Sequence, residues 1–431
     1  MEDTLRGFMR EHIYPNEQRF MRECEEMRVK PGSEWTQPSI VVELMQVSKR
    51  LGLWNLWLPN DTAAIAGYKG AGLTNVQYAK LCEIMGTANH MEFAAQCCNC
   101  ASPDTGNMET LARFANAEQK DKWLRPLLSG EIKSCFAMTE PNPIHGSSDA
   151  TNISIDIKRD GSRYIINGKK WWITGAGAKE CKIMILMGKT DASASPFTQQ
   201  SMILVPMESP GITIVRPMMT IGDVEAPKGH MEIHFENVVV PIENILAGEG
   251  RGFEIAQGRL GPGRLHHACR LLGTAERALS TMCKRADSRI MFGKPLKDYD
   301  TIMQDIAKSR TDIDQARMLT QYAAHLLDTV GSKHARKELS MMKAVIPKMT
   351  QTICDRAMQM HGAMGLSQDT FLYTGFVWSR WLRFADGPDE VHWRTVARLE
   401  MKEQHSNELF RIPYYSHTSS DIHRKNPPSK L

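Results

Sequence analysis

Apolar residues recur at three- to four-residue spacing along the first 130 residues of the chain. Val41 is followed by Leu44 and Met45, and similar patterns run over 79–85 and 108–114. Residues at this spacing share one face of an α-helix, so the pattern predicts amphipathic helices. We therefore expect the N-terminal third of the protein to be helical.

The pattern changes between residues 135 and 247. Apolar residues alternate with polar ones at 153–157 and again at 231–235, ahead of a valine run at 238–240. Alternation with a period of two predicts half-buried strands, here separated by Gly and Pro turns. We expect a compact antiparallel sheet or barrel. Asn167-Gly168 within it predicts a tight hairpin turn.

Helical spacing returns from Gly252 to about Arg398, with long proline-free patterns over 268–285 and 301–327. The order of helices, sheet and helices predicts a mostly helical α+β protein. We assign residues 1–134 to an N-terminal helical domain and 135–247 to a β-barrel domain. Residues 248–408 form a C-terminal four-helix bundle, and 409–431 a flexible tail.

Size and charge agree with a multidomain globular protein. A chain of 431 residues is too long for one ordinary core. The 53 basic and 49 acidic residues leave a net charge of +4, which gives no reason to expect nucleic acid or an anionic membrane as a partner. No apolar run reaches the length of a membrane span. The acidic opening, Met1-Glu2-Asp3, is unlike a secretory signal or transit peptide.

The ten cysteines are scattered, which is typical of a reducing compartment. Cys97, Cys98 and Cys100 form one cluster. Adjacent cysteines cannot easily point at the same ion, and no further His or Cys group completes a ligand set. We expect buried, inert thiols here and no metal site.

The chain ends in Ser429-Lys430-Leu431, which is the plainest form of the peroxisomal targeting signal. The polar stretch before it, 416–428, favours a free and extended tail that an import receptor could bind. We therefore expect a location in the peroxisomal matrix.

The acid that stands out is Asp386, which follows a helical stretch and precedes Gly387-Pro388. Gly-Pro must end or bend the helix. A carboxylate at such a break can be held in a pocket and used as a base. The alternative is a helix-terminal acid that faces water.

Several segments, together with the domain order, resemble the acyl-CoA dehydrogenase family over roughly residues 1–405. They are Phe136 to Pro141, Asn167 to Thr174, Arg289 to Pro295 and Gln359 to Gly365. Two more stretches, 102–109 and 260–264, are similar to the eukaryotic branch that is often fused to a kinase-like phosphotransferase domain. This resemblance implies that FAD binds between the barrel and the helices, with an acyl-CoA thioester stacked on the flavin.

The resemblance assigns flavin contacts on two strands. Phe136, Met138 and Thr139 would contact the pyrimidine side of the flavin ring, where donors stabilise the charge of the reduced form. Trp172 would cover the far face, and the Thr174 hydroxyl would lie near the flavin N5.

A later serine and an arginine complete the contacts within one subunit. The resemblance matches Ser148, which follows an unusually long loop, to a serine near the FAD pyrophosphate and the substrate. It matches Arg264 to an arginine near the base, where a cation keeps a carboxylate ionised and contacts the substrate.

The resemblance also implies a site shared between subunits. Arg289 and Phe292 would reach into a neighbouring subunit and hold its FAD pyrophosphate, a task that suits the donor fork of arginine. Gln359 and Gly362 would touch the same pyrophosphate. The protein is then expected to be a homodimer or homotetramer.

By the resemblance, Asp386 is the base that removes the α-proton while the β-hydride passes to flavin N5. Most of the family has Glu at this position, and Asp is shorter by one C–C bond, about 1.5 Å. Pro388 and Glu390 replace a family Thr and Gln. Some relatives place their base at the position of Gly263, which carries no side chain here and so favours Asp386.

These observations predict an FAD-dependent dehydrogenation of an acyl-CoA to the trans-2-enoyl-CoA, in fatty-acid β-oxidation, with a long-chain or branched acyl group. The electron acceptor would be an electron-transfer flavoprotein or oxygen, a choice that the residues do not decide. One alternative is a peroxisomal acyl-CoA oxidase that passes electrons to oxygen, although oxidases typically carry an extra C-terminal helical domain. A second alternative is a flavin-binding relative without catalysis, such as a DNA-associated protein, which would need a concentrated basic face.

Overall fold

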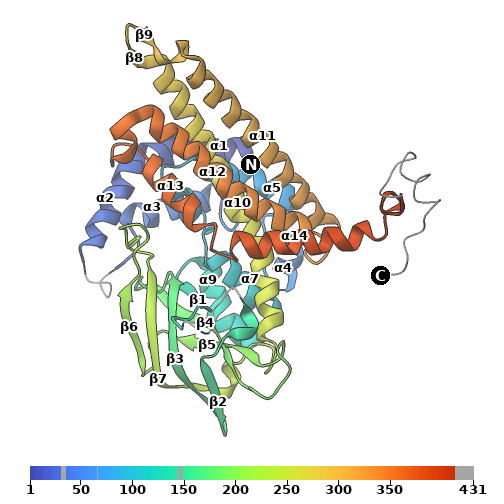
Figure 1. Ribbon diagram of the computed structural model, residues 1–431. Helices are drawn as coiled ribbons and strands as arrows, with labels where there is room; N and C mark the ends of the chain where they lie inside the picture. The colour runs from blue at the N-terminus through green and yellow to red at the C-terminus, as the bar shows by residue number, and fades with distance from the viewer. Residues whose placement is uncertain (31–34, 66, 143, 145–148, 413–431) are drawn as a thin grey trace, which may run out of the picture.

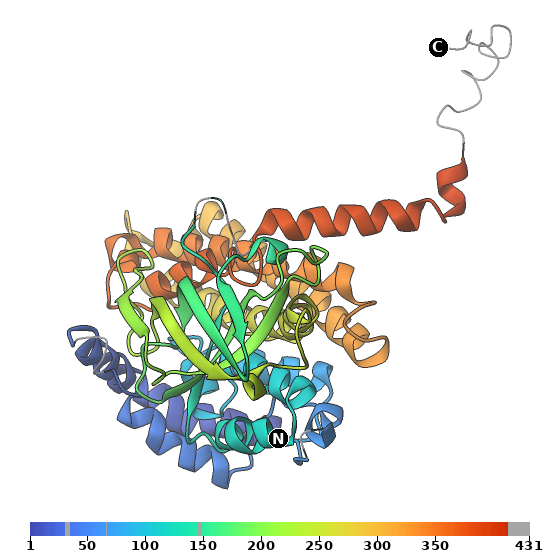
Figure 2. The ribbon, with the colours of Figure 1, turned by 90° about the horizontal axis from the view of Figure 1, so that it is seen from below.

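The computed structural model describes the chain except for residues 31–34, 66, 143, 145–148 and 413–431. The expected order of helices, sheet and helices is confirmed. The sheet lies below both helical parts in Figure 1, and Figure 2 shows it between the N-terminal helices on one side and the C-terminal helices on the other. No helix in the described ranges combines the length and low charge that crossing a bilayer requires.

The N-terminal part is helical, as its apolar spacing predicts. Val41, Leu44 and Met45 are buried on one face of the third helix. The helices are α1 (Glu2–Phe8), α2 (Glu17–Arg28), α3 (Ser39–Arg50), α4 (Asn60–Ile65), α5 (Asn75–Met85), α6 (Phe93–Cys97), α7 (Asp104–Phe114), α8 (Ala117–Gln119) and α9 (Arg125–Ser129).

The cysteine cluster at 97–100 belongs to the core of this part. Cys97, Cys98 and Cys100 are fully buried and unpaired. Burial raises the pKa of the Cys100 thiol to about 12. These are the buried, unreactive thiols that the sequence predicts, because only a thiolate is an effective nucleophile or metal ligand.

Seven strands form one curled sheet in the order β1-β4-β2-β3-β7-β6, with β5 on the other edge of β4. The sheet is mixed rather than purely antiparallel, because β1 runs parallel to β4. The hairpin of β2 and β3 intervenes between them, so the chain can return in the same direction. The strands are β1 (Lys133–Ala137), β2 (Asp156–Asp160), β3 (Arg163–Thr174), β4 (Cys181–Lys189), β5 (Gln200–Pro206), β6 (Ile212–Pro217) and β7 (His230–Pro241).

The predicted hairpin turn at Asn167-Gly168 is wrong. Both residues lie inside β3, where the pairing with β7 shifts between Ile166 and Gly168. The Oδ1 atom of Asn167 accepts a hydrogen bond from the backbone N–H of Asn237, at 2.7 Å. A bulge therefore uses the two residues that would otherwise favour a turn.

The real hairpin turn joins β2 to β3. Asp160 pairs with Arg163, which leaves a two-residue loop. Gly161 in this loop has a φ of +59°, a conformation that glycine adopts without strain. The two loop residues, Gly161 and Ser162, are the Gly-X pair of a two-residue hairpin loop.

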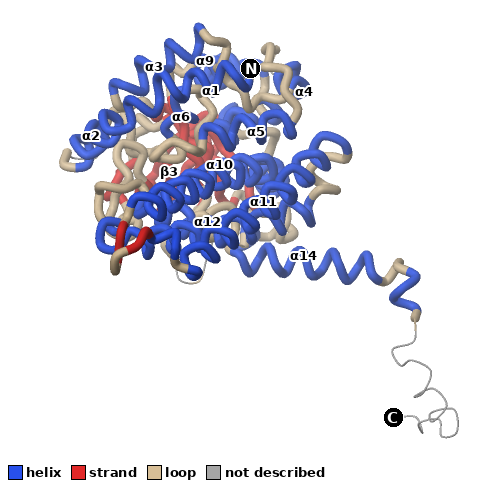
Figure 3. The backbone as a smooth tube through the Cα atoms, turned by 90° about the horizontal axis from the view of Figure 1, so that it is seen from above, coloured by secondary structure: helices blue, strands red, loops and turns tan. Residues whose placement is uncertain are grey.

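The C-terminal part consists of long helices. Helices α10, α11 and α12 pack against one another, and α13 and α14 both pack on α12. Figure 3 shows the three long helices side by side and α14 extending away from them. The elements are α10 (Gly252–Ser288), β8 (Ile290–Met291), β9 (Lys294–Pro295), α11 (Asp300–Thr329), α12 (Arg336–His361), α13 (Leu372–Trp381) and α14 (Asp389–Gln404).

Candidate active site

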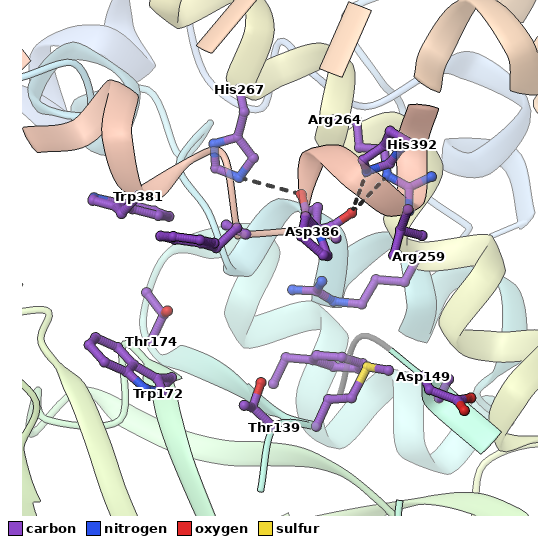
Figure 4. Close-up of a pocket in the computed structure, with 18 of the residues that line it drawn as sticks. Thr139, Asp149, Trp172, Thr174, Arg259, Arg264, His267, Trp381, Asp386 and His392 are labelled. Carbon is purple, nitrogen blue, oxygen red and sulfur yellow. Dashed lines mark hydrogen bonds and ion pairs between the residues drawn. The ribbon is translucent and has the colours of Figure 1, made fainter. Parts of the chain in front are cut away.

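A cavity of about 1560 Å³ lies where the sheet meets the C-terminal helices. Its volume exceeds the roughly 300–1,000 Å³ of a usual small-molecule site, so it has room for two ligands. Asp386 and its neighbours form one wall in Figure 4, and Thr139, Trp172 and Thr174 form the opposite wall. The predicted residues Phe136, Met138 and Arg264 line the same cavity.

The backbone at Asp386 is held in an unusual conformation. Its φ is +57°, and the following Gly387 has a φ of +104°. The carbonyl oxygen of Asp386 accepts hydrogen bonds from Arg264 Nε at 3.2 Å and from His392 Nε2 at 3.1 Å. The ammonium group of Lys343 donates to the carbonyl of Gly387. These clamps from three helices direct the carboxylate into the cavity.

The Asp386 carboxylate is ionised despite its burial. Its side chain is 18% exposed, and the Nε2 atom of His267 lies 3.8 Å from Oδ2. Burial raises the pKa of Asp386, but His267, Arg259, Arg264 and Lys343 together outweigh it and hold the pKa below its usual value. A carboxylate that is ionised and partly desolvated is suited to accept a proton.

Both histidines beside Asp386 are neutral near pH 7. Burial, with a contribution from Arg270, lowers the pKa of His267 to about 4. Burial, with Arg264 and Lys343, lowers the pKa of His392 to about 4 as well. The positive charge around Asp386 at neutral pH is therefore carried by the arginines and Lys343.

A buried ion pair, Lys170 with Glu140, holds the end of β1 and the segment that follows it. The buried ammonium of Lys170 donates to the carbonyl of Met138 at 2.8 Å and to Glu140 Oε1 at 2.9 Å. Glu140 in turn accepts the backbone N–H groups of Ser154 and Ile155. This network fixes the backbone that presents Phe136, Met138 and Thr139 to the cavity.

The end of β3 presents Trp172 and Thr174. Trp172 borders the cavity and is 37% exposed. The Thr174 Oγ1 atom lies 2.8 Å from His230 Nδ1, and His230 Nε2 lies 3.2 Å from a carboxylate oxygen of Glu225. In a neutral His230 ring whose Nε2 proton faces the Glu225 carboxylate, the Thr174 hydroxyl donates to Nδ1.

The cavity is suited to an anionic ligand. Seven cationic residues of the described chain line it against three acids: Lys228, Arg259, Arg264, Arg336, Arg380, Arg394 and Arg398 against Glu140, Asp149 and Asp386. Two nitrogen atoms of the lining residues, Arg380 Nη1 and Trp381 Nε1, are buried donors that have no acceptor among the described residues. Buried donors normally have partners, so these two indicate a ligand with acceptor atoms.

Four predicted cofactor residues lie away from this cavity. Arg289 follows α10 directly, and Phe292 lies in the turn of the β8–β9 hairpin, where it is 94% exposed. Gln359 and Gly362, at the end of α12, are also exposed. Their role across a subunit boundary stays a prediction. Ser148 lies outside the described residues.

Three departures noted in the sequence are now placed. A Cβ atom built on Gly263 would lie 3.7 Å from Asp386 Oδ2, so the two alternative positions for a base face each other. Pro388 precedes the first residue of α14. Glu390 is exposed and is not part of the cavity lining, so it adds no negative charge to the site.

Arg259 and His267 border the site without having been singled out from the sequence. Arg259 stacks on the Phe136 ring, with its Cζ 4.0 Å from the centroid. Positions 259, 263, 267 and 270 follow one another at intervals of four, four and three, which places them on one face of α10. This polar face on an otherwise amphipathic helix is a signal that the sequence carries.

Comparison with known protein families gives a match for each of the three parts of the chain. The N-terminal domain of the acyl-CoA dehydrogenases matches residues 1–131, the middle domain 135–238 and the C-terminal domain 250–400. A solved protein of Mycobacterium abscessus, described as an acyl-CoA dehydrogenase, is 44% identical, with a TM-score of 0.87 over 93% of this chain and 97% of that one. Butyryl-CoA dehydrogenase of Megasphaera elsdenii shares the fold, with a TM-score of 0.76 and 23% identity.

Three curated relatives are similar over 93% of this chain. Acyl-CoA dehydrogenase family member 10 of Mus musculus is 51% identical, and the match covers 37% of its length. IBR3 of Arabidopsis thaliana, named an acyl-CoA dehydrogenase, is 49% identical over 50% of its length. FadE2 of Mycobacterium tuberculosis, also named an acyl-CoA dehydrogenase, is 47% identical over 95% of its length. The chain thus spans half or less of the first two relatives.

Proposed function

Because this chain belongs to the acyl-CoA dehydrogenase family, we propose that it removes hydrogen from the α and β carbons of an acyl-CoA thioester with FAD as cofactor. The product is the trans-2-enoyl-CoA. The observation that carries this proposal is the ionised carboxylate of Asp386, directed into a cavity large enough for two ligands. The activity also fits the names of the relatives.

The residues present fit FAD. The donors Arg380 Nη1 and Trp381 Nε1 have no acceptor among the described residues, and the excess of arginine suits a pyrophosphate. Trp172, Thr174 and the segment around Thr139 would hold the isoalloxazine ring. When bound, FAD supplies the acceptor for the hydride that leaves the β-carbon.

Asp386 would take the α-proton of the thioester. The α C–H electron pair then forms the new double bond as the β-hydride departs. A thioester α-proton is a weak acid, and it is removable only when donors hold the carbonyl oxygen. The backbone N–H of Asp386 has no acceptor among the described residues, so it is available for this role. Arg264 and His392 hold the following peptide group in place through the Asp386 carbonyl.

We propose a long-chain or branched acyl group as the substrate, because the cavity has room beyond one cofactor. The test is a titration of the purified yellow protein with acyl-CoAs of increasing length, under anaerobic conditions. Loss of the visible flavin absorbance with any of them supports the proposed reaction. A yellow protein that no thioester bleaches would refute it.

We further propose an electron-transfer flavoprotein as the acceptor, a peroxisomal location and participation in β-oxidation. Reduction of an electron-transfer flavoprotein, compared with peroxide formation in air, distinguishes a dehydrogenase from an oxidase. The location rests on Ser429-Lys430-Leu431, outside the described residues. A fluorescent fusion at the N-terminus should enter peroxisomes, and deletion of Leu431 should leave it outside.

A further inference from the structure

A chain of buried polar groups leads to Asp386 from the interior of the protein. Glu92 is fully buried and receives Arg270 Nη2 at 3.1 Å. The same Nη2 atom lies 3.1 Å from His267 Nδ1. His267 Nε2 lies 3.8 Å from Asp386 Oδ2. Figure 4 shows the His267 ring directed at the carboxylate.

This geometry fixes the tautomer of His267. An arginine guanidinium has only donors, so Nδ1 of His267 must accept. The pKa of His267 is about 4, lowered first by burial, so the ring is neutral at pH 7 and carries one proton. That proton is on Nε2, the atom that faces Asp386. The N–H of His267 therefore points at the base.

We propose that His267 is a positioning residue that holds the Asp386 carboxylate in its reactive orientation through Nε2–H, with its tautomer set by Arg270 and Glu92. This inference rests on the proposed function, because it assigns the support of the same base. At 3.8 Å the contact is longer than a hydrogen bond. Hydrogen bonds of active sites often shorten only when the substrate is bound.

Burial, with a contribution from Arg270, keeps His267 neutral, and the charged groups around it are paired with one another. Arg270 is paired with Glu92, and Glu92 also receives the ammonium of Lys228. On the other side, Asp386 faces Arg259, Arg264 and Lys343. A second positive charge on His267 would lie beside Arg270 in the interior, so a neutral donor is the form that this site tolerates.

The fold leaves room for this arrangement on α10. His267 is one helical turn after Gly263, and a Cβ at Gly263 would already be 3.7 Å from Asp386 Oδ2. The carboxylate therefore sits in a notch of the helix surface, between a residue without a side chain and an N–H donor. Because aspartate is shorter than glutamate by one C–C bond, its carboxylate lies close to α10, where the N–H of His267 can orient it.

The test compares three variants of the FAD-loaded protein by stopped-flow bleaching with an acyl-CoA. His267→Phe keeps an aromatic ring and removes the donor. It should slow flavin reduction about 10- to 100-fold, the scale of a small misplacement, with little change in the half-saturating thioester concentration. Because a donor is lost, the pKa of Asp386 should rise and the acid limb of the rate should move to higher pH. His267→Gln retains an N–H at the Nε2 position and should restore most of the rate.

His266→Gln is the matched control. His266 is the adjacent buried residue, its ring packs edge-on against Tyr78, and it does not line the cavity. It should match His267→Phe in any loss of stability but keep the wild-type rate. A wild-type rate in His267→Phe, or equal slowing in His267→Phe and His267→Gln, would overturn the proposal. Equal slowing in His266→Gln would do the same.

A readout that does not need turnover separates this inference from the proposed function. In yellow protein with ¹⁵N-labelled histidine, the signals lost in His267→Gln should show a protonated Nε2 and a bare Nδ1 at pH 7. Protonation of Nδ1 would overturn the inference, whatever the activity. If the wild-type protein is bleached by no acyl-CoA, the proposed function fails, and the role of His267 in supporting that base fails with it.

Discussion

Gly263 and Asp386 lie next to each other, since a Cβ on Gly263 would be 3.7 Å from Asp386 Oδ2. A carboxylate side chain at either position can therefore reach the same space. We expect the double variant Gly263→Glu/Asp386→Gly to reduce its flavin at least ten times faster than the single variant Asp386→Gly. Anaerobic stopped-flow with one acyl-CoA measures this. No recovery, in a folded yellow protein, would mean that the α10 position cannot serve the same substrate carbon.

Asp386→Asn keeps the volume and the backbone clamps of Asp386 but removes the base. The rate of flavin reduction should fall by about 10²- to 10⁴-fold, the usual contribution of a general base. FAD content, measured by visible absorbance, should stay at the wild-type level. Wild-type turnover in this variant would place the base elsewhere.

The pH dependence follows from the charges around Asp386. Since four neighbours hold its pKa below the ordinary value of about 4, the carboxylate is ionised above that pH. Its contribution to activity and stability is present at higher pH and is lost as the pH falls through the lowered pKa. The acid limb of kcat/KM should therefore lie below pH 4.

Removing one of these neighbours should move that limb. Arg264→Gln should shift it to higher pH, while Lys297→Gln, in an exposed ion pair with Asp287, should not. Bound substrate excludes water from the carboxylate, so the limb of the single-turnover rate should lie above that of kcat/KM. The opposite order of the two limbs would contradict this explanation.

The buried pair of Lys170 and Glu140 should matter for both stability and FAD. Lys170→Met leaves the Glu140 carboxylate buried without its cation, which costs about 3–5 kcal/mol. It also releases the Met138 carbonyl, so FAD should dissociate more readily. Denaturant unfolding and FAD retention on gel filtration measure the two effects. The double variant Lys170→Met/Glu140→Gln should be the more stable of the two, and a less stable double variant would rule out the charge argument.

The exposed residues Arg289 and Gln359 test the shared site. Neither lines the cavity of its own subunit, so Arg289→Ala should leave monomer folding unchanged. If it holds FAD in a neighbouring subunit, the variant should bind FAD at least tenfold more weakly, by fluorescence titration. Lys308→Ala on α11, also exposed, is the control. Unchanged FAD affinity would leave these residues without a part in cofactor binding.

The regular parts of the fold could be predicted because their signals are local. The spacing over 268–285 and 301–327 predicts helices that the structure contains within α10 and α11. The turn predicted at Asn167-Gly168 is wrong because these residues form a bulge in β3 beside Asn237 of β7, and this pairing leaves no local signal. Which of two turn signals forms is decided by strands that pair far along the chain.

The site shows the same division. Asp386 stands out because Gly-Pro follows it, whereas Trp172 and Thr174 are assigned by the family resemblance. The sequence places His267 and Arg259 on one face of a helix, but that this face borders the site follows only from the packing of α10 beside the loop at 386. His230 is similar, since its contact with Thr174 joins β3 to β7. Distances between segments so far apart in sequence are set by packing.

The left-handed backbone at Asp386 has a consequence for any search for a hardier protein. A φ of +57° strains most residues by about 1–2 kcal/mol, and Asp is one of the few besides glycine that adopt it, because its short side chain can form local hydrogen bonds. A glycine at this position would relieve that strain but would leave Arg259, Arg264 and Lys343 without the carboxylate they face. Directed evolution for heat resistance alone should therefore retain the acid, even in a population that is never asked to turn over a substrate.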